Sequence, residues 1–255
     1  MFWRIAAPLV ILLLVVVGWY ALISWRDIPA YLLPSPGEIL EAFKDIRDPL
    51  IKATLVTARS SLYGFGLSLV FGCLIAFAMS QSKMVERGLY PYAIFLQTVP
   101  IIAIAPIIII WLGPGLPSIV TVSFIISLFP IITSTATGLT RLPPEWQELF
   151  DVYQASWWQR LFKLRLPAAI PNIITGARTS AGLSVVGAIV GEYFTSVSGE
   201  SYGIAYLVLT YSERLRTAEL FATTIMSAIL GLVIFGGVSV IGDFIMRRWH
   251  FNPAS

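Results

Sequence analysis

The chain has 255 residues, of which 57% are apolar and 12% are charged, and its formal net charge is +3. This apolar content is larger than a soluble domain of the same length can bury in one core, so the composition excludes a soluble protein and predicts an integral membrane protein. The only cysteine, Cys73, and the only histidine, His250, exclude a disulfide framework, a Cys/His metal site and a histidine-activated nucleophile.

Six apolar runs along the chain are each long enough, at about 20 residues or more, to cross the apolar core of a membrane as a helix. The expected spans are residues 5–24, 60–82, 88–112, 118–140, 166–191 and 220–242. The first run is too long for the apolar region of a signal peptide and no A-x-A-like cleavage site follows it, so we expect an uncleaved span. The polar residues 25–59 are expected to lie outside the membrane.

The third and fourth runs belong to one stretch, Gly88–Thr140, that contains no charged residue. This stretch is about twice as long as one span requires. The sequence GPGLP at residues 113–117 is rich in the residues that form tight turns, so we expect it to separate two spans. Pro100 and Pro106 are expected to bend the third span, because proline cannot donate a backbone hydrogen bond.

Six spans place both chain termini on the same side of the membrane. That side carries nine basic residues: Arg4, Lys83, Arg87, Arg141, Arg160, Lys163, Arg165, Arg247 and Arg248. The opposite side carries six: Arg26, Lys44, Arg47, Lys52, Arg214 and Arg216. Because lysine and arginine are enriched in cytoplasmic loops, we expect both termini to be cytoplasmic in a multi-pass protein of the cell inner (plasma) membrane.

Residues 143–167 form a polar interruption between the fourth and fifth runs. Apolar residues recur in it every three or four positions: Trp146, Leu149, Phe150, Tyr153, Trp157, Leu161 and Leu164. This spacing predicts one amphipathic helix or two successive helices. A helix lying in the lipid interface should be basic along its whole polar face, whereas Glu145, Glu148 and Asp151 make the first turns acidic. The pattern therefore favours docking onto a soluble protein partner.

The same stretch resembles a known family. Glu148, position 154 and the sequence Leu164-x-Leu166-Pro167 are similar in spacing to the Glu-Ala-Ala loop of binding-protein-dependent ABC-transporter permeases. Three further motifs resemble the branch that serves nitrate, sulfonates, taurine, and pyrimidine or riboflavin precursors: LLPSP at 32–36, QTVPIIAIAPIIIIWLGPG at 97–115 and GLSVVGAIVGEYF at 182–194. The resemblance covers almost the whole chain after the first span. It implies an all-α integral membrane protein with a single permease domain at residues 1–255.

In that family the loop forms coupling helices that sit in a cleft of the ATP-binding subunit. The resemblance implies a cytoplasmic coupling loop at residues 141–165, between the fourth and fifth spans, with these ATPase-coupling residues: Glu148, Leu149, Phe150, Asp151, Tyr153, Gln154, Ala155 and Ser156. Leu149-Phe150 replaces the usual Ala-Ala pair, and Gln154 replaces the usual glycine. Because a non-glycine residue tolerates positive φ poorly, either the bend is made differently or the two helices are less sharply separated.

The resemblance implies the membrane-spanning permease subunit of an ABC importer, which is not an enzyme and moves a small organic or anionic solute by alternating access. The chain has no G-x-x-x-x-G-K-[ST] phosphate-binding loop, so ATP and Mg²⁺ are expected in a separate ATPase subunit, and no cofactor in this chain. The other expected partners are an extracytoplasmic solute-binding protein, a second copy of the chain in a homodimer and the lipid bilayer, with no nucleic acid. The alternative is a small secondary transporter or channel, which needs no such docking loop.

Polar residues at membrane depth mark the expected translocation path: Gln97, Thr98, Arg178, Ser180, Ser184 and Glu192. Arg178 would cost about 2.5 to 3.5 kcal/mol at the centre of a span, so it must face protein or water. The alternatives for Arg178 are an anion-binding site, snorkelling to the interface, or pairing inside the dimer. The sequence Gly187-x-x-x-Gly191 permits close helix packing as well as a place on the path. No motif identifies the solute.

Overall fold

The computed structural model describes residues 2–196 and 202–248, and all the regular structure within these ranges is helical. The helices are α1 (Phe2–Arg26), α2 (Pro36–Asp45), α3 (Arg47–Gln81), α4 (Lys83–Thr98), α5 (Ile101–Leu112), α6 (Leu116–Thr140), α7 (Pro144–Val152), α8 (Trp157–Arg160), α9 (Leu166–Ser196), α10 (Ile204–Glu213) and α11 (Thr217–Arg248). A π-helical turn, η1 (Leu161–Arg165), joins α8 to α9.

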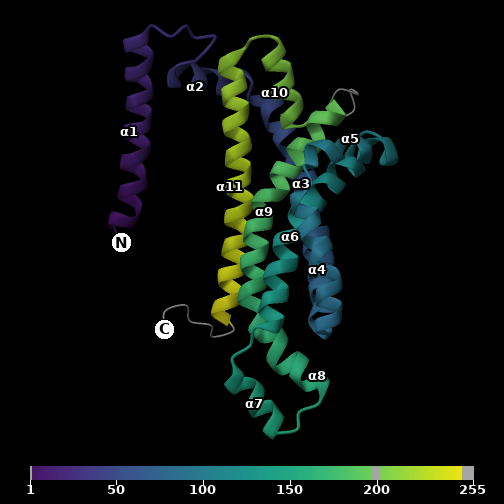
Figure 1. Ribbon diagram of the computed structural model, residues 1–255. Coiled ribbons are helices and arrows are strands. Elements are labelled where there is room, and N and C mark those ends of the chain that lie inside the picture. The colour runs from purple at the N-terminus through teal and green to yellow at the C-terminus, as the bar shows by residue number, and fades with distance from the viewer. Residues whose placement is uncertain (1, 197–201, 249–255) are drawn as a thin grey trace.

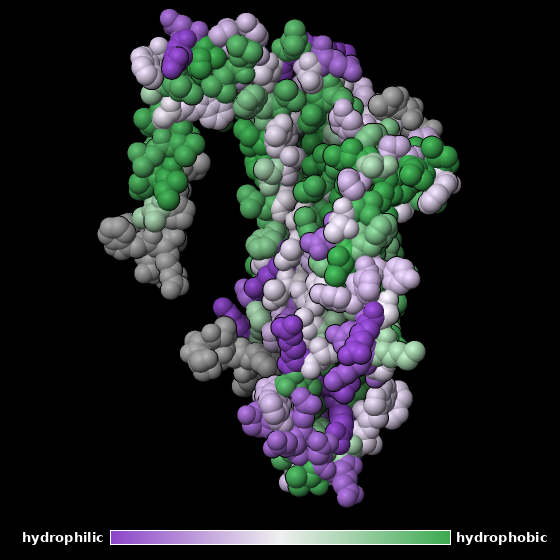
Figure 2. All heavy atoms as spheres, in the orientation of Figure 1, coloured by the Kyte–Doolittle hydropathy of each residue, from purple (hydrophilic) through white to green (hydrophobic). Residues whose placement is uncertain are grey.

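Four helices of the described chain are long and apolar enough to cross a membrane: α3, α6, the continuous helix Trp157–Ser196 and α11. The pair α4 and α5 makes a fifth candidate if the two helices count as one bent span. Within α1, the segment Leu13–Arg26 is apolar but shorter. Figure 2 shows a broad apolar band on the visible face, with hydrophilic residues gathered at its two ends. This distribution is the one expected for a membrane protein.

The long helices α3, α6, α9 and α11 lie side by side in a bundle, and α4 and α5 lie along its side (Figure 1). α2 and α10 lie at one end, whereas α7 and α8 project from the other, where α11 also ends. α1 stands apart from the bundle along most of its length (Figures 1 and 2). It is attached near its C-terminal end, where the Trp19 ring lies 5.9 Å from that of Phe221 and the Tyr20 hydroxyl accepts a hydrogen bond of 3.0 Å from the Gly37 N–H.

The expected third span, residues 88–112, is wrong as a continuous helix. α4 already begins at Lys83, and the chain turns by 98° between α4 and α5. The break lies at Val99 and Pro100, both of which have extended backbone conformations, and Pro100 has no N–H with which to continue the helix. The bend predicted at Pro100 is therefore confirmed, and it is much sharper than a kink. Pro106, in contrast, lies inside α5 without ending it.

Two other boundaries differ from the expected ones. α3 begins at Arg47, so the polar residues before the expected second span at 60–82 belong to the same helix. The charged segment between the expected fifth and sixth spans contains the helix α10 (Ile204–Glu213), which the sequence did not predict. The turn predicted at residues 113–117 is confirmed, because Gly113 and Gly115 both take positive φ, at 79° and 108°.

Small residues hold α6 and α9 together along their whole length. A Cβ atom added at Gly187 would lie 2.6 Å from the Ser123 Cα, so only glycine permits this approach. The Ser123 hydroxyl donates a hydrogen bond of 2.8 Å to the Ser184 carbonyl, and the Ser180 hydroxyl donates one of 2.6 Å to the Ser127 carbonyl. The two bonds run in opposite directions between the helices, and they satisfy hydroxyl groups that lipid could not.

α3 packs on α6 in the same way. Gly64 lies directly against the Ser123 side chain, and Gly72 against Ile131. The Ser68 hydroxyl donates a hydrogen bond of 2.8 Å to the Phe124 carbonyl. The three helices α3, α6 and α9 therefore form the centre of the bundle, with small side chains at their contacts.

A methyl group at Gly187 should separate α6 from α9. The substitution Gly187→Ala places a Cβ against backbone atoms of α6, so we expect it to destabilise the protein by about 1–3 kcal/mol. The measurement is the thermal unfolding temperature of the protein in detergent. Gly182→Ala is the matched control in the same helix, since a Cβ there meets no atom within 4 Å, and it should leave the unfolding temperature unchanged or raise it slightly. Equal unfolding temperatures for the two variants would contradict this account of the packing.

Candidate functional site

The coupling loop predicted at residues 141–165 contains two successive helices, the second of the two arrangements that the apolar spacing allowed. α7 starts with Pro144 at its first helical position, and it ends at Val152. α8 starts after Ser156, whose hydroxyl accepts a hydrogen bond from the Gln159 N–H, while the Gln159 side chain accepts one from the Ser156 N–H. This capping box fixes the point at which the second helix begins.

The bend between the two helices has the geometry that glycine usually provides. Gln154 takes the left-handed conformation with φ of 47°. The Gln154 N–H donates to the Asp151 carbonyl at 2.9 Å and the Ala155 N–H to the Phe150 carbonyl at 3.0 Å, the bonding pattern of a Schellman motif at the end of α7. Both expected alternatives, a different bend and less separated helices, are therefore wrong. A non-glycine residue in the left-handed conformation lowers the free energy of unfolding by about 1–2 kcal/mol.

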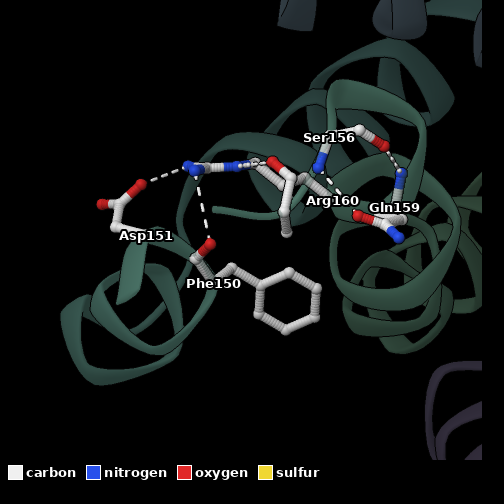
Figure 3. A network of polar contacts seen from close by, with 6 residues as sticks. Phe150, Asp151, Ser156, Gln159 and Arg160 are labelled. Carbon is white, nitrogen blue, oxygen red and sulfur yellow. Dashed lines mark hydrogen bonds and ion pairs between the residues drawn. The ribbon is translucent and has the colours of Figure 1, made fainter. Parts of the chain in front are cut away.

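Arg160 closes the bend from the α8 side. Its guanidinium donates to the Ala155 carbonyl at 3.0 Å and to the Phe150 carbonyl at 3.4 Å, and it forms an ion pair of 2.5 Å with the Asp151 carboxylate (Figure 3). Two of these acceptors, Phe150 and Asp151, belong to the last turn of α7. The Asp151 carboxylate is thus engaged within the loop. Helical periodicity does not single out Arg160 for this role, because Asp151 and Phe150 lie nine and ten positions before it in the sequence.

The two helices expose a large apolar surface outside the bundle. The large apolar side chains that are exposed here are Trp146, Leu149, Val152, Tyr153, Trp157, Trp158 and Phe162. Val152 is 80% exposed and Tyr153 is 77% exposed, values that are unusual for such residues in a folded protein. Glu148 and Gln154 are exposed beside them, whereas Phe150 and Ala155 are half-buried. An exposed apolar group of this size is typical of a surface that binds another protein or a membrane.

A cavity lies at the break between α4 and α5, in the wall of the bundle. Its volume is about 420 Å³, and both Gln97 and Thr98 line it. The other lining residues are Leu96, Val99, Pro100, Ile101, Ile125, Ile126, Phe129, Pro130 and Leu183. The lining includes residues of α6 and α9, and none of these side chains is charged. The cavity therefore combines an apolar wall with one amide and one hydroxyl group.

The other four residues predicted for the path do not line this cavity. Ser180 and Ser184 are fully buried in the contact between α6 and α9. The Ser180 hydroxyl bonds across to the Ser127 carbonyl, whereas the Ser184 hydroxyl donates to the Ala181 carbonyl of its own helix and the Ser184 carbonyl accepts from Ser123. Gly187 and Gly191 also lie against α6, at Ser123 and Ile119. The packing interpretation of Gly187-x-x-x-Gly191 therefore has direct geometric support.

Arg178 pairs within the chain. Its guanidinium lies 2.6 Å from the Asp243 carboxylate of α11 and also donates to the Ser239 carbonyl at 3.4 Å. The sequence does not predict this pair, because the sixth apolar run ends at residue 242 and Asp243 lies just beyond it.

Glu192 is fully buried, and it links α9 to α3 and α10. Its carboxylate accepts a hydrogen bond of 2.9 Å from the Thr57 hydroxyl and one of 3.4 Å from the Ala205 N–H at the start of α10. Gly203 lies directly against the carboxylate, where no side chain would fit. The carboxyl group thus lies at the N-terminal end of α10, where it accepts a backbone hydrogen bond. The sequence could not indicate this contact, since it did not predict α10.

Residues 68–249 match the model of a protein family described as "Binding-protein-dependent transport system inner membrane component". The chain is 31% identical to the formylaminopyrimidine transport permease protein of Halalkalibacterium halodurans over 94% of each chain. It is 30% identical to the riboflavin transport system permease protein of Chloroflexus aurantiacus, over 94% of this chain and 89% of that one. Its fold is similar to that of a chain in a methionine ABC transporter in an inward-facing conformation, with a TM-score of 0.65 and 16% identity over 80% of this chain and 98% of that one.

Removing the Arg160 side chain should loosen the bend of the coupling loop. Arg160→Ala deletes three polar contacts to the end of α7 and to Ala155, and because the ion pair is partly exposed we expect a loss of only about 1 kcal/mol. Backbone hydrogen exchange of residues 150–156 should become about fivefold faster. Lys163→Ala, in the same loop and without an ion-pair partner among the described residues, is the control. An unchanged exchange rate in Arg160→Ala would show that Arg160 does not hold the bend.

Proposed function

The chain belongs to the family of binding-protein-dependent transport system inner membrane components, and from this premise we propose that its coupling loop is the surface through which a separate ATPase subunit drives transport. The chain is the permease subunit of an ABC importer for small solutes, a multi-pass membrane protein and not an enzyme. Its partners include an ATPase subunit and a solute-binding protein. Family membership overturns the alternative of a small secondary transporter or channel.

The exposed apolar group on α7 and α8 carries the proposal. Tyr153 and Val152 lie at the tip of a loop whose shape is fixed by the Schellman motif, the capping box and the Arg160 contacts. A rigid bend can transmit a push, whereas a flexible loop would absorb it. Leu149 and Glu148 lie on the same short helix, so a partner protein could form an apolar contact and an acidic contact with it at once. ATP and Mg²⁺ would be bound by the partner, and this chain would need no cofactor.

The topology we propose has six spans with both termini cytoplasmic. α1 would be the first span, the bent pair α4 and α5 the third, and the coupling loop would lie between the fourth and fifth. The excess of basic residues at the coupling-loop end supports this orientation. A second copy of the chain would complete the translocation path as a homodimer.

The cavity at the α4–α5 break would form part of the path. Because its lining carries no charged side chain, an anion would leave its hydration shell there without a compensating cation, at a cost of several kcal/mol. The lining therefore favours an uncharged solute that forms hydrogen bonds with Gln97 and Thr98 and packs on Phe129. The printed names of two relatives, for formylaminopyrimidine and riboflavin, are those of heterocyclic compounds and agree with such a solute. Transport would follow alternating access, in which the coupling loop moves α6 and α9 together.

The proposed topology can be measured by cysteine labelling. In a Cys73→Ala background, a cysteine at Ser156 in the coupling loop and one at Ser212 at the end of α10 are both exposed in the structure. We expect a membrane-impermeant thiol reagent added to intact cells to label the Ser212→Cys variant only. The Ser156→Cys variant should react only after the membrane has been opened. Reversed labelling would contradict the proposed orientation.

Substitutions on α7 should uncouple the two subunits without unfolding the bundle. We expect Leu149→Ala to weaken binding of the ATPase subunit by about 2 kcal/mol or more, if Leu149 is a central contact, and Glu148→Arg to add repulsion or an unpaired charge. Co-purification with the ATPase subunit and solute-stimulated ATP turnover should both fall. Leu32→Ala removes an equally exposed leucine at the opposite end and should have no effect.

The same variants separate docking from binding to the lipid interface. An interfacial helix would gain attraction to anionic lipid from Glu148→Arg, and it would depend on Trp158 instead. Full binding and turnover in both α7 variants would remove the basis for assigning the loop its function.

A further inference from the structure

A polar pocket lies at the root of the coupling loop, between the turn from α3 to α4, the end of α6, α7 and η1. Its volume is about 250 Å³, and its charged lining residues are Lys83, Arg165 and Glu86. A second pocket of about 460 Å³ shares Lys83 and Glu86 and continues along α4 past Arg87 to Tyr90 and Pro91. The two pockets adjoin at Lys83 and Glu86, and we refer to them together as the groove.

The positive charges around this groove exceed the negative ones. None of the ion pairs formed by the described residues includes Lys83, Arg87 or Arg165. The Arg165 guanidinium donates one hydrogen bond, of 3.4 Å, to the Ser80 carbonyl, which leaves most of its N–H groups for another acceptor. Glu86 is the one carboxylate in the lining. Three cations against one carboxylate make the groove a site for an anion.

The backbone adds to this positive potential. α4 has 16 residues and starts at Lys83, so the positive end of its dipole lies at the groove. The Ser82 side chain caps the helix by accepting a hydrogen bond of 3.2 Å from the Val85 N–H. The helix end alone would not define a site. Together with the cavity and the three cations that form no ion pair among the described residues, it strengthens the attraction of a negatively charged group.

The groove also meets an apolar surface, which distinguishes its ligand from a free ion. Lys83, Arg87 and Tyr90 follow one another at helical spacing along one face of α4. Tyr92 and Phe95, further along the same helix, are exposed large apolar side chains. Tyrosine is typical of the membrane–water boundary, and basic residues between helices on the cytoplasmic side are suited to anionic lipid headgroups. A ligand that fills the groove would therefore be anionic at one end and apolar at the other.

We propose that this groove binds an anionic phospholipid, with its phosphate group between Lys83 and Arg165 and its acyl chains along α4 at Tyr90. The pocket walls come from the α3–α4 turn and from both ends of the coupling loop, including Gln147 of α7. A bound headgroup would therefore join the coupling loop to α3 and α4. The lipid holds the coupling loop against α3 and α4 at the place where the loop joins the bundle.

Native mass spectrometry of the permease in complex with its ATPase subunit tests this proposal. The probes are phosphatidylglycerol, phosphatidylcholine and inorganic phosphate, each added to delipidated complex. We expect the wild-type complex to retain phosphatidylglycerol in preference to phosphatidylcholine. The variant Lys83→Gln/Arg165→Gln should bind phosphatidylglycerol about tenfold more weakly or worse, from the loss of two cations near the membrane surface.

Two further variants keep the test decisive if Arg165 also matters for folding. Lys83→Gln/Arg87→Gln leaves the bond between Arg165 and Ser80 in place and should weaken lipid binding to a similar extent. Lys44→Gln/Arg47→Gln removes the same charge from exposed residues at the opposite end and should change nothing.

The outcomes are distinct. Phosphatidylglycerol that resists displacement by inorganic phosphate supports a lipid site. Displacement by inorganic phosphate at comparable concentration would overturn the lipid assignment and leave a site for free phosphate. Equal retention of the two lipids by the wild type, or equal retention of phosphatidylglycerol by all variants, would overturn the proposal altogether.

Discussion

The close contact between α6 and α9 is the constraint on which the rest of the structure depends. Lipid tails are as apolar as the side chains of the helices, so helices in a membrane associate by tight packing and by hydrogen bonds rather than by a hydrophobic driving force. Gly187 and Gly191 let α9 approach the backbone of α6, and the serine hydroxyls bond across the contact. The coupling loop is the connection between these two helices, and the cavity at the α4–α5 break is lined by both. In the proposed mechanism, a push on the loop would therefore reach the cavity through two helices that are tightly packed against each other.

Much of this arrangement could be predicted from the sequence, because membrane insertion imposes strong patterns. Spans must be apolar because they lie in lipid, and this predicts the apolar runs. A tight turn favours glycine, which predicts the turn at residues 113–117, and the helical spacing of apolar residues around Glu148 predicts an amphipathic segment. Gln97 and Thr98 were singled out as polar groups next to a proline, and they do line the cavity. The role of all six residues in a translocation path stays a prediction, and Ser180 and Ser184 lie in the packed contact between α6 and α9.

The features that sequence reasoning missed depend on contacts between distant residues or on conformations that composition does not specify. Pro100 indicated a bend, but the turn of 98° depends on how α5 packs against α6 and α9. The Arg178–Asp243 pair joins residues on two helices that only the fold brings together, and Glu192 is stabilised by an unpredicted helix. Gln154 shows the limit of propensity, since the Schellman bonds and the Arg160 contacts hold a glutamine in a conformation that favours glycine.

The central claim is that α7 and the bend that follows it contact the ATPase subunit. The most direct measurement places a photo-crosslinking amino acid at Val152, whose side chain is 80% exposed at the tip of the coupling loop, and irradiates membranes that contain the assembled transporter. The account predicts a covalent adduct between this chain and the ATPase subunit, and none from the same amino acid placed at Leu32. Adducts with lipid alone at position 152, or equal adducts from both positions, would contradict it.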